Sequence, residues 1–598
     1  MNHIAKTCAV ALVLGLVLTA TGLWATGGTE EPAAAAEKEM VLDPTTGEMV
    51  EAPRYGGTLT YAERVEPPGT DPWNQGHGPR GVDGVAEKLG IANWGIDRDE
   101  FGFESRYVPL FAMRPNLAES WEKPDPLTII FKIRPGVRWH DKAPMNGREL
   151  TAQDVEYNFH RYTGLGSGFT EPSPFDPMKA ATWESITATD DSTVVFKLKA
   201  PRNDALETII SGWFLLIMPP EVIEQHGDVQ DWRNLVGTGP YMLADWVKGS
   251  SMTYTKNPDY WGTDEKYPEN RLPYIDQLRR VIMPEQATFL AALRSGKHDI
   301  IGIPGDTQLG DIGQVEALKR TNPEIRLYPW YLRSGTSVTF NLRRESLFND
   351  IRVRQAMQMA IDLETINETY YRGFAKWQPQ GMIGDSLTGF YVPFEEWPEE
   401  VKKGYMYDPE GAEKLLDEAG YPRGADGIRF KTFLNHFWRA DVGYQEIAVE
   451  YWKAIGVDVE IQVREETAHM ALITEGAYEG MATAGLGNDQ APMPMVDWMS
   501  SAYKANGNPG HQDPVMDAKA EAAVAAATPD EQQRLIREAD VYFIEQQWYI
   551  WGPKPPSFNA SQPWIKGYNG EVELGLSRSV AMLARIWIDS DLKQEMGG

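Results

Sequence analysis

The chain has 598 residues, of which 42% are hydrophobic and 24% are charged, so it can bury a large core and is not a disordered protein. Its length corresponds to about four domain-sized units or to interleaved lobes of one molecule. Asp and Glu number 86 against 57 Lys and Arg, a net charge of −29, which argues against nucleic acid as a partner and against adhesion to anionic lipid.

The N-terminus has the pattern of a secretory signal peptide. Lys6 precedes an apolar run of 12 residues, Ala9–Ala20, and small residues follow it. The run is too short to span a bilayer, so we expect residues 1–25 to be removed by a cut after Ala20 or Ala25. Residues 26–53 are predicted to form a flexible tether, because their low-complexity start has no hydrophobic periodicity.

The cysteine content limits redox and metal chemistry. Cys8 is the only cysteine, so the chain forms no internal disulfide and no Cys-rich metal site. Because Cys8 precedes the apolar run, it does not stand at the cut, where a lipid anchor needs its cysteine. We therefore expect an exported protein, periplasmic or at the cell surface, without a lipid anchor.

The first half of the folded chain reads as strands with two helices. Glu66–Arg80 carries three consecutive turn signals and is predicted to be a loop that holds Trp73 and His77. A helix is predicted over Thr151–Tyr162, with Asp154 three residues after the capping Thr151. The second predicted helix covers 286–295, and strands are predicted over 58–62, 127–133, 193–198, 237–243, 251–254 and 274–283.

The second half has clearer signals. Asp408 is predicted to cap a helix that has Pro409 in its first turn and ends at Gly420. A strand, a helix and a strand follow in order, which indicates an α/β lobe with a right-handed crossover. The ranges are 428–434, 441–455 and 457–463, and further helices are predicted over 351–366 and 529–545.

Motifs for catalysis, metals and nucleotides are absent from the sequence. It contains no HExxH, CxxC, GxSxG or Walker loop, and no GxGxxG after a strand. Acidic pairs are abundant, but none is distinguished as the acid and nucleophile of a glycosidase. The residues alone therefore indicate a secreted acidic α/β binding protein, and neither a metal nor a cofactor is predicted.

A series of motifs resembles the family 5 extracellular solute-binding proteins, the peptide-type receptors of bacterial ABC importers. Pro115–Tyr162 contains the PNLAESW opening, the FKIRPGVRWHD strand and turn, and the TAQDVEY helix start. Further matches occur in the expected order: GTGPY at 237–241, NPDYW at 257–261, PYID at 273–276, FNL at 340–342, RVRQAMQMAI at 352–361, 407–420 and WKAIGVDV at 452–459.

The resemblance implies an α/β, two-lobed periplasmic-binding-protein-like fold of type II with an extra domain. One lobe would combine 54–95, 235–330 and 555–598, with the extra domain 96–234 packed on it, and 331–554 would form the second lobe. Two crossing strands near Tyr328–Ser334 and Trp551–Ser557 would form the hinge. The ligand would bind between the lobes, and the closed form, a monomer and not an enzyme, would dock on a membrane permease.

The ligand class depends on one loop. In peptide receptors of this family, an Asp on a Gly-containing loop of the second lobe holds the peptide ammonium, which needs a carboxylate once it is desolvated. The matching loop is Gly485–Pro492, where alignment puts Asn488 at the Asp position and Asp489 one residue later. Either Asp489 serves in a shifted register, or the ammonium site is absent.

Absence of that site would favour a neutral ligand such as a cello-, xylo- or manno-oligosaccharide, which needs aromatic platforms. A secreted hydrolase is a distant alternative. For each aromatic candidate the competing interpretation is ordinary packing, and for the two polar loop residues it is a turn residue or a solvated charge. The candidate ligand-binding residues are Leu486, Gly487, Asn488, Asp489, Trp73, His77, Tyr331, Trp438, Trp498 and Trp551.

Overall fold

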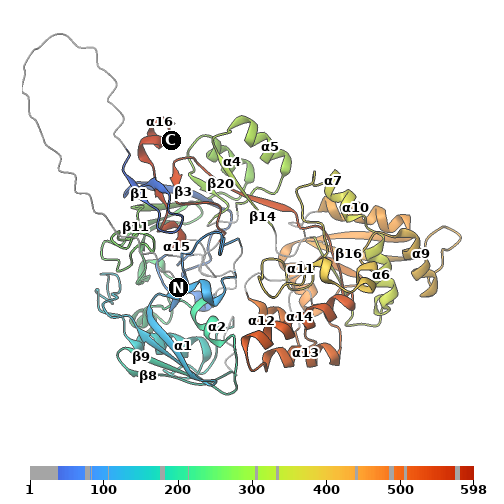
Figure 1. Ribbon diagram of the computed structural model, residues 1–598, viewed down its shortest axis with the longest axis horizontal. Coiled ribbons are helices and arrows are strands. Elements are labelled where there is room, and N and C mark those ends of the chain that lie inside the picture. Colours follow the sequence, from blue (N-terminus) through green and yellow to red (C-terminus); the bar gives the residue numbers. More distant parts are fainter. Residues whose placement is uncertain are drawn as a thin grey trace, which may run out of the picture.

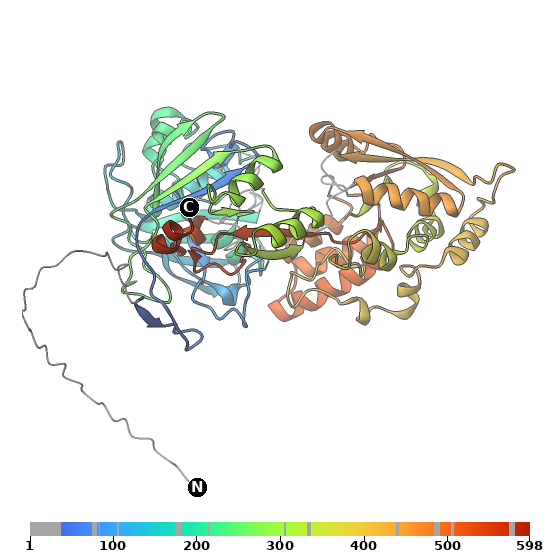
Figure 2. The same ribbon diagram turned by 90° about the horizontal axis from the view of Figure 1, so that it is seen from above.

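Two lobes lie side by side and are joined by long segments that include two neighbouring strands, β14 and β20 (Figures 1 and 2). The computed structural model describes residues 38–74, 81–82, 84–104, 107–174, 182–212, 215–303, 307–331, 336–437, 442–483, 491–503, 508–572 and 580–598. Within those residues, no helix has both the length and the apolar character that crossing a membrane requires.

The first lobe is built on a mixed seven-stranded sheet. Its middle strand β3, Thr58–Glu63, runs parallel to β12 and matches the strand that the sequence predicts over 58–62. The order is β10 (Tyr241–Val247), β11 (Ser251–Lys256), β12 (Gln277–Ile282), β3, β13 (Ile300–Ile301), β20 (Pro556–Ser561) and β14 (Arg326–Tyr331), with helices α4 (Gln286–Arg294) and α5 (Ile312–Thr321).

A smaller four-stranded antiparallel sheet packs on this lobe. Helix α1, Ala152–Thr163, covers it and begins with the predicted capping box of Thr151 and Asp154. Leu59 of the large sheet and Phe131 of the small one belong to one buried cluster, so the two units share a core. The other elements are β6 (Ala118–Asp125), β7 (Thr128–Ile133), β9 (Thr193–Leu198), β8 (Trp183–Asp190), β4 (Gly90–Ala92), β5 (Met113–Pro115), α2 (Ala205–Ser211) and α3 (Pro220–His226).

The second lobe has a five-stranded sheet with helices around it (Figure 1). Its order is β17 (Val457–Arg464), β16 (Phe430–Phe437), β18 (Met481–Thr483), β15 (Val338–Phe340) and β19 (Tyr549–Ile550). The parallel pairing of β16 with β17 confirms the predicted strand–helix–strand unit. The helices are α6 (Ile351–Met359), α7 (Leu363–Thr369), α8 (Glu399–Lys403), α9 (Pro409–Glu418), α10 (Val442–Ala454), α11 (Glu466–Glu475), α12 (Pro492–Met499), α13 (Pro514–Val524) and α14 (Pro529–Glu545).

The predicted helix over 351–366 is wrong as a single element. Helix α6 ends at Met359, and Asp362 caps α7 by accepting a hydrogen bond from the Thr365 main-chain N–H at 3.0 Å. An Asp that bonds its own downstream backbone starts a new helix instead of continuing the old one. The predicted strand at 237–243 also begins later, at Tyr241.

The C-terminal part of the predicted tether is folded. Strands β1 (Met40–Leu42) and β2 (Met49–Glu51) form a hairpin against the first lobe. Lys266 Nζ donates to Asp43 at 2.9 Å, and Lys38 Nζ donates to Asp589 at 3.0 Å. Asp589 is the residue before the C-terminal helix α16 (Ser590–Glu595). The other elements of this C-terminal part are the strand pair β21 (Ile565–Lys566) and β22 (Trp587–Ile588) and the helix α15 (Val580–Leu583). The predicted signal peptide, residues 1–25, lies outside the described residues.

Candidate functional site

Two strands of the second lobe lead into the segments that carry the predicted ligand residues. Strands β16 and β18 are parallel neighbours, with Leu434 opposite Met481, and they end at Phe437 and Thr483. Parallel strands have their carboxyl ends at one edge of the sheet, where α/β proteins bind ligands. Figures 1 and 2 show β16 running from the α9 side toward the first lobe, so this edge faces it.

Polar side chains fix this edge of the sheet. His469 of α11 has Nε2 2.9 Å from the Thr483 carbonyl oxygen, and its ring centroid is 5.7 Å from that of Phe437. Asn435 Nδ2 donates to the Met481 carbonyl at 3.1 Å. Burial lowers the pKa of His469, so the imidazole is neutral at pH 7 and donates to Thr483. The strand ends are thereby tied to each other and to α11.

Trp438, Leu486, Gly487, Asn488 and Asp489 follow these strand ends in the sequence and lie outside the described residues. His77 also lies outside them. Trp73, Tyr331, Trp498 and Trp551 lie within the described residues.

The chain crosses between the lobes twice, as the resemblance implies. Strands β14 and β20 pair in the first lobe, with Tyr331 opposite Pro556. Strands β15 and β19 pair in the second lobe, with Val338 opposite Ile550. The crossings therefore run from Tyr331 to Val338 and from Ile550 to Pro556. Two adjacent covalent links of this kind allow the lobes to rotate relative to each other.

A charged cluster stands beside these crossings. Lys376 and Lys554 exchange two main-chain hydrogen bonds of 3.1 and 2.8 Å, and their ammonium groups donate to Asp385 at 2.6 and 2.9 Å. Lys376 Nζ also lies 4.5 Å from the ring centroid of Tyr331. Burial would raise the pKa of Asp385, but Lys554 and Lys376 hold it at about 2. Nothing in the sequence signalled this cluster, because its members are brought together by the fold alone.

Two predicted aromatic residues of the second lobe, Trp551 and Trp498, pack against its core. Trp551 is only 5% exposed, and Gln358 clamps its main chain, accepting from its N–H at 2.6 Å and donating to its carbonyl at 3.3 Å. Trp498 is half-buried on α12, with its ring centroid 5.5 Å from that of Tyr503. Both contact the cluster of buried side chains formed around α12, α13 and α14.

Trp73 belongs to the first lobe. Its Nε1 donates to the Arg161 carbonyl at 2.9 Å, and the Arg161 guanidinium lies 5.4 Å from its ring centroid. Arg161 in turn pairs with the fully buried Asp71 at 2.7 Å. The indole is thus anchored between the large and small sheets, with its polar atom already bonded.

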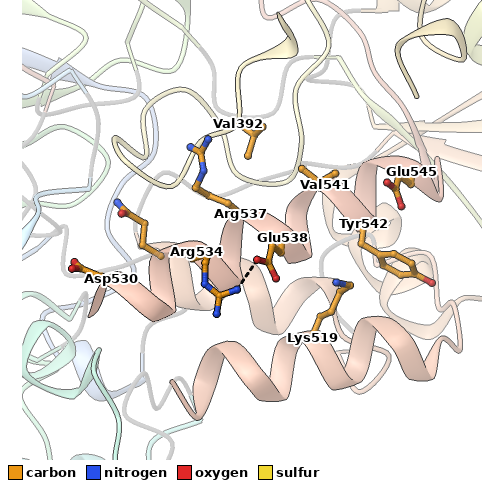
Figure 3. A pocket seen from close by; sticks show the side chains of 10 residues that line it. Val392, Lys519, Asp530, Arg534, Arg537, Glu538, Val541, Tyr542 and Glu545 are labelled. Atoms are coloured by element: carbon orange, nitrogen blue, oxygen red, sulfur yellow. Dashed lines mark hydrogen bonds and ion pairs between the residues drawn. The ribbon is translucent and has the colours of Figure 1, made fainter. Parts of the chain in front are cut away.

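A surface groove of about 620 Å³ runs along α13 and α14 (Figure 3). Its charges are balanced and partly paired, as in the 2.6 Å ion pair of Arg534 with Glu538. It contains none of the predicted ligand residues. Its lining is Val392, Lys519, Asp530, Gln533, Arg534, Arg537, Glu538, Val541, Tyr542 and Glu545. Among the described residues, no group of His, Cys, Asp and Glu side chains is arranged to hold a metal ion.

Comparison with known proteins identifies the family. The pattern described as bacterial extracellular solute-binding proteins, family 5 Middle, matches residues 112–507. Heme-binding protein A of Haemophilus influenzae is 27% identical over 76% of this chain and 81% of its own length. The dipeptide-binding protein of Escherichia coli is 24% identical over 63% of this chain and 68% of its own length.

Solved structures share the fold over almost their whole length. The periplasmic binding protein DppA of Helicobacter pylori, in complex with the peptide STSA, has a TM-score of 0.68 at 23% identity and covers 90% of this chain and 99% of its own. HbpA2 of Haemophilus parasuis has a TM-score of 0.70 at 21% identity and covers 89% and 100%. With its two lobes, double crossing and family pattern, the chain belongs to the bacterial extracellular solute-binding proteins of family 5.

Proposed function

We propose that this protein is the extracytoplasmic receptor of an ABC importer, and that it captures an oligopeptide between its lobes and delivers it unaltered to a membrane permease. The family match over residues 112–507 carries the proposal. The two crossings beside Tyr331 and Trp551 supply the hinge on which closure depends. In this role the protein is exported, acts as a monomer, is not an enzyme and needs no cofactor.

The ligand class rests on the loop that follows β18. An extended peptide gains main-chain hydrogen bonds along its length, and its ammonium group needs one buried carboxylate. Asp489, in a register shifted by one residue, is our candidate for that carboxylate. The dipeptide-binding relative and the STSA complex of the structural neighbour support the peptide class.

A ligand panel tests the ligand class. Di- to pentapeptides, cello-, xylo- and manno-oligosaccharides and hemin, the last because a relative is named for heme, are compared by thermal shift and calorimetry. A ligand at 100 times its Kd stabilises the folded state by about 2.7 kcal/mol, which raises the melting temperature by several degrees. We expect peptides to do so. A melting-temperature response to sugars alone would show that the ligand is an oligosaccharide and not a peptide. Cleavage of the recovered ligand, measured by mass spectrometry, would show that the protein is a hydrolase and not a receptor.

Variants test the ammonium contact. Asp489→Ala should weaken peptide binding at least about 30-fold, because truncating one partner of a buried charge pair costs about 2–5 kcal/mol. Asp530→Ala, at an exposed position on α14, is the matched control and should leave the affinity unchanged. An N-acetylated peptide should bind both the wild type and Asp489→Ala weakly. Unchanged peptide affinity of Asp489→Ala would eliminate the shifted register. If the protein binds sugars instead, Trp438→Ala should strongly weaken sugar binding.

A further inference from the structure

Three arginines from distant parts of the chain converge on one pocket of the first lobe. Arg114 of β5, Arg134 after β7 and Arg585 before β22 line a cavity of about 200 Å³, whose remaining wall is Tyr260–Thr263. In a chain with a net charge of −29, such a concentration of guanidinium groups stands out against its surroundings. Its lining brings the segment after β7 of the small sheet together with the segment after β11 of the large sheet, and it includes no residue of the crossings between the lobes.

One carboxylate serves two of these arginines. Arg585 donates to Glu265 through Nε at 2.8 Å and Nη2 at 2.6 Å, and Arg114 Nη2 donates to the same carboxylate. Burial would raise the pKa of Glu265, but Arg585 and Arg114 hold it at about 2, so this carboxylate is always ionised. One negative charge thus faces two positive ones.

The third arginine, Arg134, has no ion pair among the described residues. Its Nε donates to the Asn116 carbonyl at 2.8 Å, and its guanidinium lies 5.0 Å from the ring centroid of Trp261. Burial lowers the pKa of Arg134, and the positive charge of Arg114 lowers it further. The guanidinium groups of Arg114 and Arg134 therefore repel each other across the pocket.

Two other buried acids act on these arginines, Asp264 on Arg585 and Glu87 on Arg134, and each accepts hydrogen bonds from further donors. Glu87 is buried and accepts hydrogen bonds from Tyr260 Oη at 2.9 Å and Trp261 Nε1 at 3.2 Å. Burial raises the pKa of Glu87, whereas hydrogen bonds from its four donors, which include Thr238 Oγ1 at 2.9 Å and Asn116 Nδ2 at 3.2 Å, act against that rise. Glu119, which also acts on Arg134, is exposed, and solvent screens it. Arg114 Nε, by contrast, is buried and has no hydrogen-bond partner.

The wall of the pocket is closely fitted. A Cβ atom on Gly262 would lie 2.6 Å from the Tyr260 ring, so only glycine lets the loop fold back on this tyrosine. Tyr260 is 5% exposed, and its hydroxyl is fixed by Glu87. The guanidinium groups therefore face a cavity that exists before any ligand enters it.

We propose that this pocket is a second ligand site, distinct from the site between the lobes, and that it binds a small oxyanion with the chemistry of phosphate or sulfate. The planar donor fork of arginine matches such oxyanions, and a bound anion would offset the repulsion between the guanidinium groups that line the cavity. At about 200 Å³ the cavity falls below the about 300 Å³ typical of drug-sized ligands, which excludes an oligopeptide. The anion would bridge the small sheet to the first lobe.

The test is anion binding to the whole mature protein, purified without phosphate or sulfate. Inorganic phosphate should raise the melting temperature in a saturable way, whereas sodium chloride at equal ionic strength should not. Arg114→Gln should weaken phosphate binding at least ten-fold in calorimetry, since Glu265 keeps its pair with Arg585 and the fold is retained. Arg233→Gln, at an exposed arginine paired with Asp231, is the matched control and should bind as the wild type does.

Equal shifts by phosphate and chloride, or unchanged phosphate affinity of Arg114→Gln, would overturn the site. If Arg114→Gln does not fold, the wild type gives a direct readout by ³¹P NMR. The protein should broaden the phosphate resonance, and added sulfate should reverse the broadening. A phosphate resonance that stays sharp would count against the proposal. Tighter binding of glycerol phosphate than of inorganic phosphate would assign the site to a phosphate group on a larger solute. Weaker binding of glycerol phosphate would assign it to the free anion. Peptide affinity should be the same in Arg114→Gln and the wild type, so this site and the peptide proposal fail independently.

Discussion

At the scale of single residues, a buried ion pair ties distant segments of the first lobe together. Asp71 is fully buried and accepts from Arg161 Nη2 at 2.7 Å, from Arg161 Nη1 at 3.1 Å and from the Val229 N–H at 3.2 Å. Its Oδ1 also accepts from the Trp73 N–H at 3.1 Å. The sequence predicted a loop at Glu66–Arg80 but could not show this anchor, because the partners of Asp71 lie far away in the chain.

Asp71→Asn should lower the free energy of unfolding by about 3–5 kcal/mol, because it leaves the guanidinium of Arg161 buried without a carboxylate. Urea denaturation followed by Trp fluorescence measures the change. Glu400→Gln removes a surface ion pair with Lys403, whose side chains are 84% and 69% exposed, and should change stability by less than about 0.5 kcal/mol. A loss at Asp71 as small as that of the control would show that the buried pair does not hold this loop.

At the scale of elements, local sequence signals were sufficient to predict single helices and strands. They did not predict which distant strands pair with each other. Helix α14 covers Pro529–Glu545 as predicted, because Thr528 and Pro529 mark its start in the sequence itself. The strand β3 was predicted over 58–62, but nothing local indicated that it would pair with β12, whose residues come more than 200 positions later. The break between α6 and α7 was missed because the apolar pattern continues across it, and only the capping bond of Asp362 separates the two helices.

The cap of α9 gives a test at this scale. Asp408 accepts from the Gly411 N–H at 2.9 Å, as its position before Pro409 predicts. Asp408→Ala should cost about 1 kcal/mol in urea denaturation, since a helix N–H loses its acceptor. Asp408→Asn should retain nearly all of the stability, because the amide oxygen also accepts. Equal losses in the two variants would assign the effect to charge instead of capping.

At the scale of the whole molecule, the lobes touch on the side away from the crossings. Asn203 Nδ2, just before α2, donates to the Ala526 carbonyl of the second lobe at 2.9 Å. The Tyr107 ring meets Phe390 of the second lobe edge-to-face, with centroids 6.5 Å apart. Figure 1 shows α2 next to α12 at this contact. The resemblance to a family was enough to predict two lobes that close on each other. It could not predict which residues meet between the lobes, because that depends on how the two lobes are placed and no local sequence pattern indicates it.

This contact contains a carboxyl group that titrates near neutral pH. Glu207 of α2 is half-buried with its carboxylate oxygen Oε1 inside the contact, and Tyr107 donates a hydrogen bond to the carboxyl group. Burial, and then the charge of Asp204, raise the pKa of Glu207 from its ordinary value of 4.5 to about 8. A group with a raised folded-state pKa binds more protons in the folded state, so its contribution is complete below pH 4.5 and is lost as the pH rises through 8. The carboxyl is therefore neutral in the folded protein at pH 7.

Glu207→Gln should remove this part of the pH dependence, because an amide keeps a neutral polar group beside Tyr107 at every pH. We expect wild type and variant to be similarly stable near pH 5, and the variant to be more stable by about 1–3 kcal/mol at pH 9. Urea denaturation at pH 5, 7 and 9 measures the difference. Asp540, whose pKa burial raises to about 7, contributes equally to both proteins and cancels in it. Glu224→Gln, at an exposed position of α3, is the control and should show the same dependence of stability on pH as the wild type. If Glu207→Gln and the wild type also showed the same dependence, Glu207 would already be ionised in the contact.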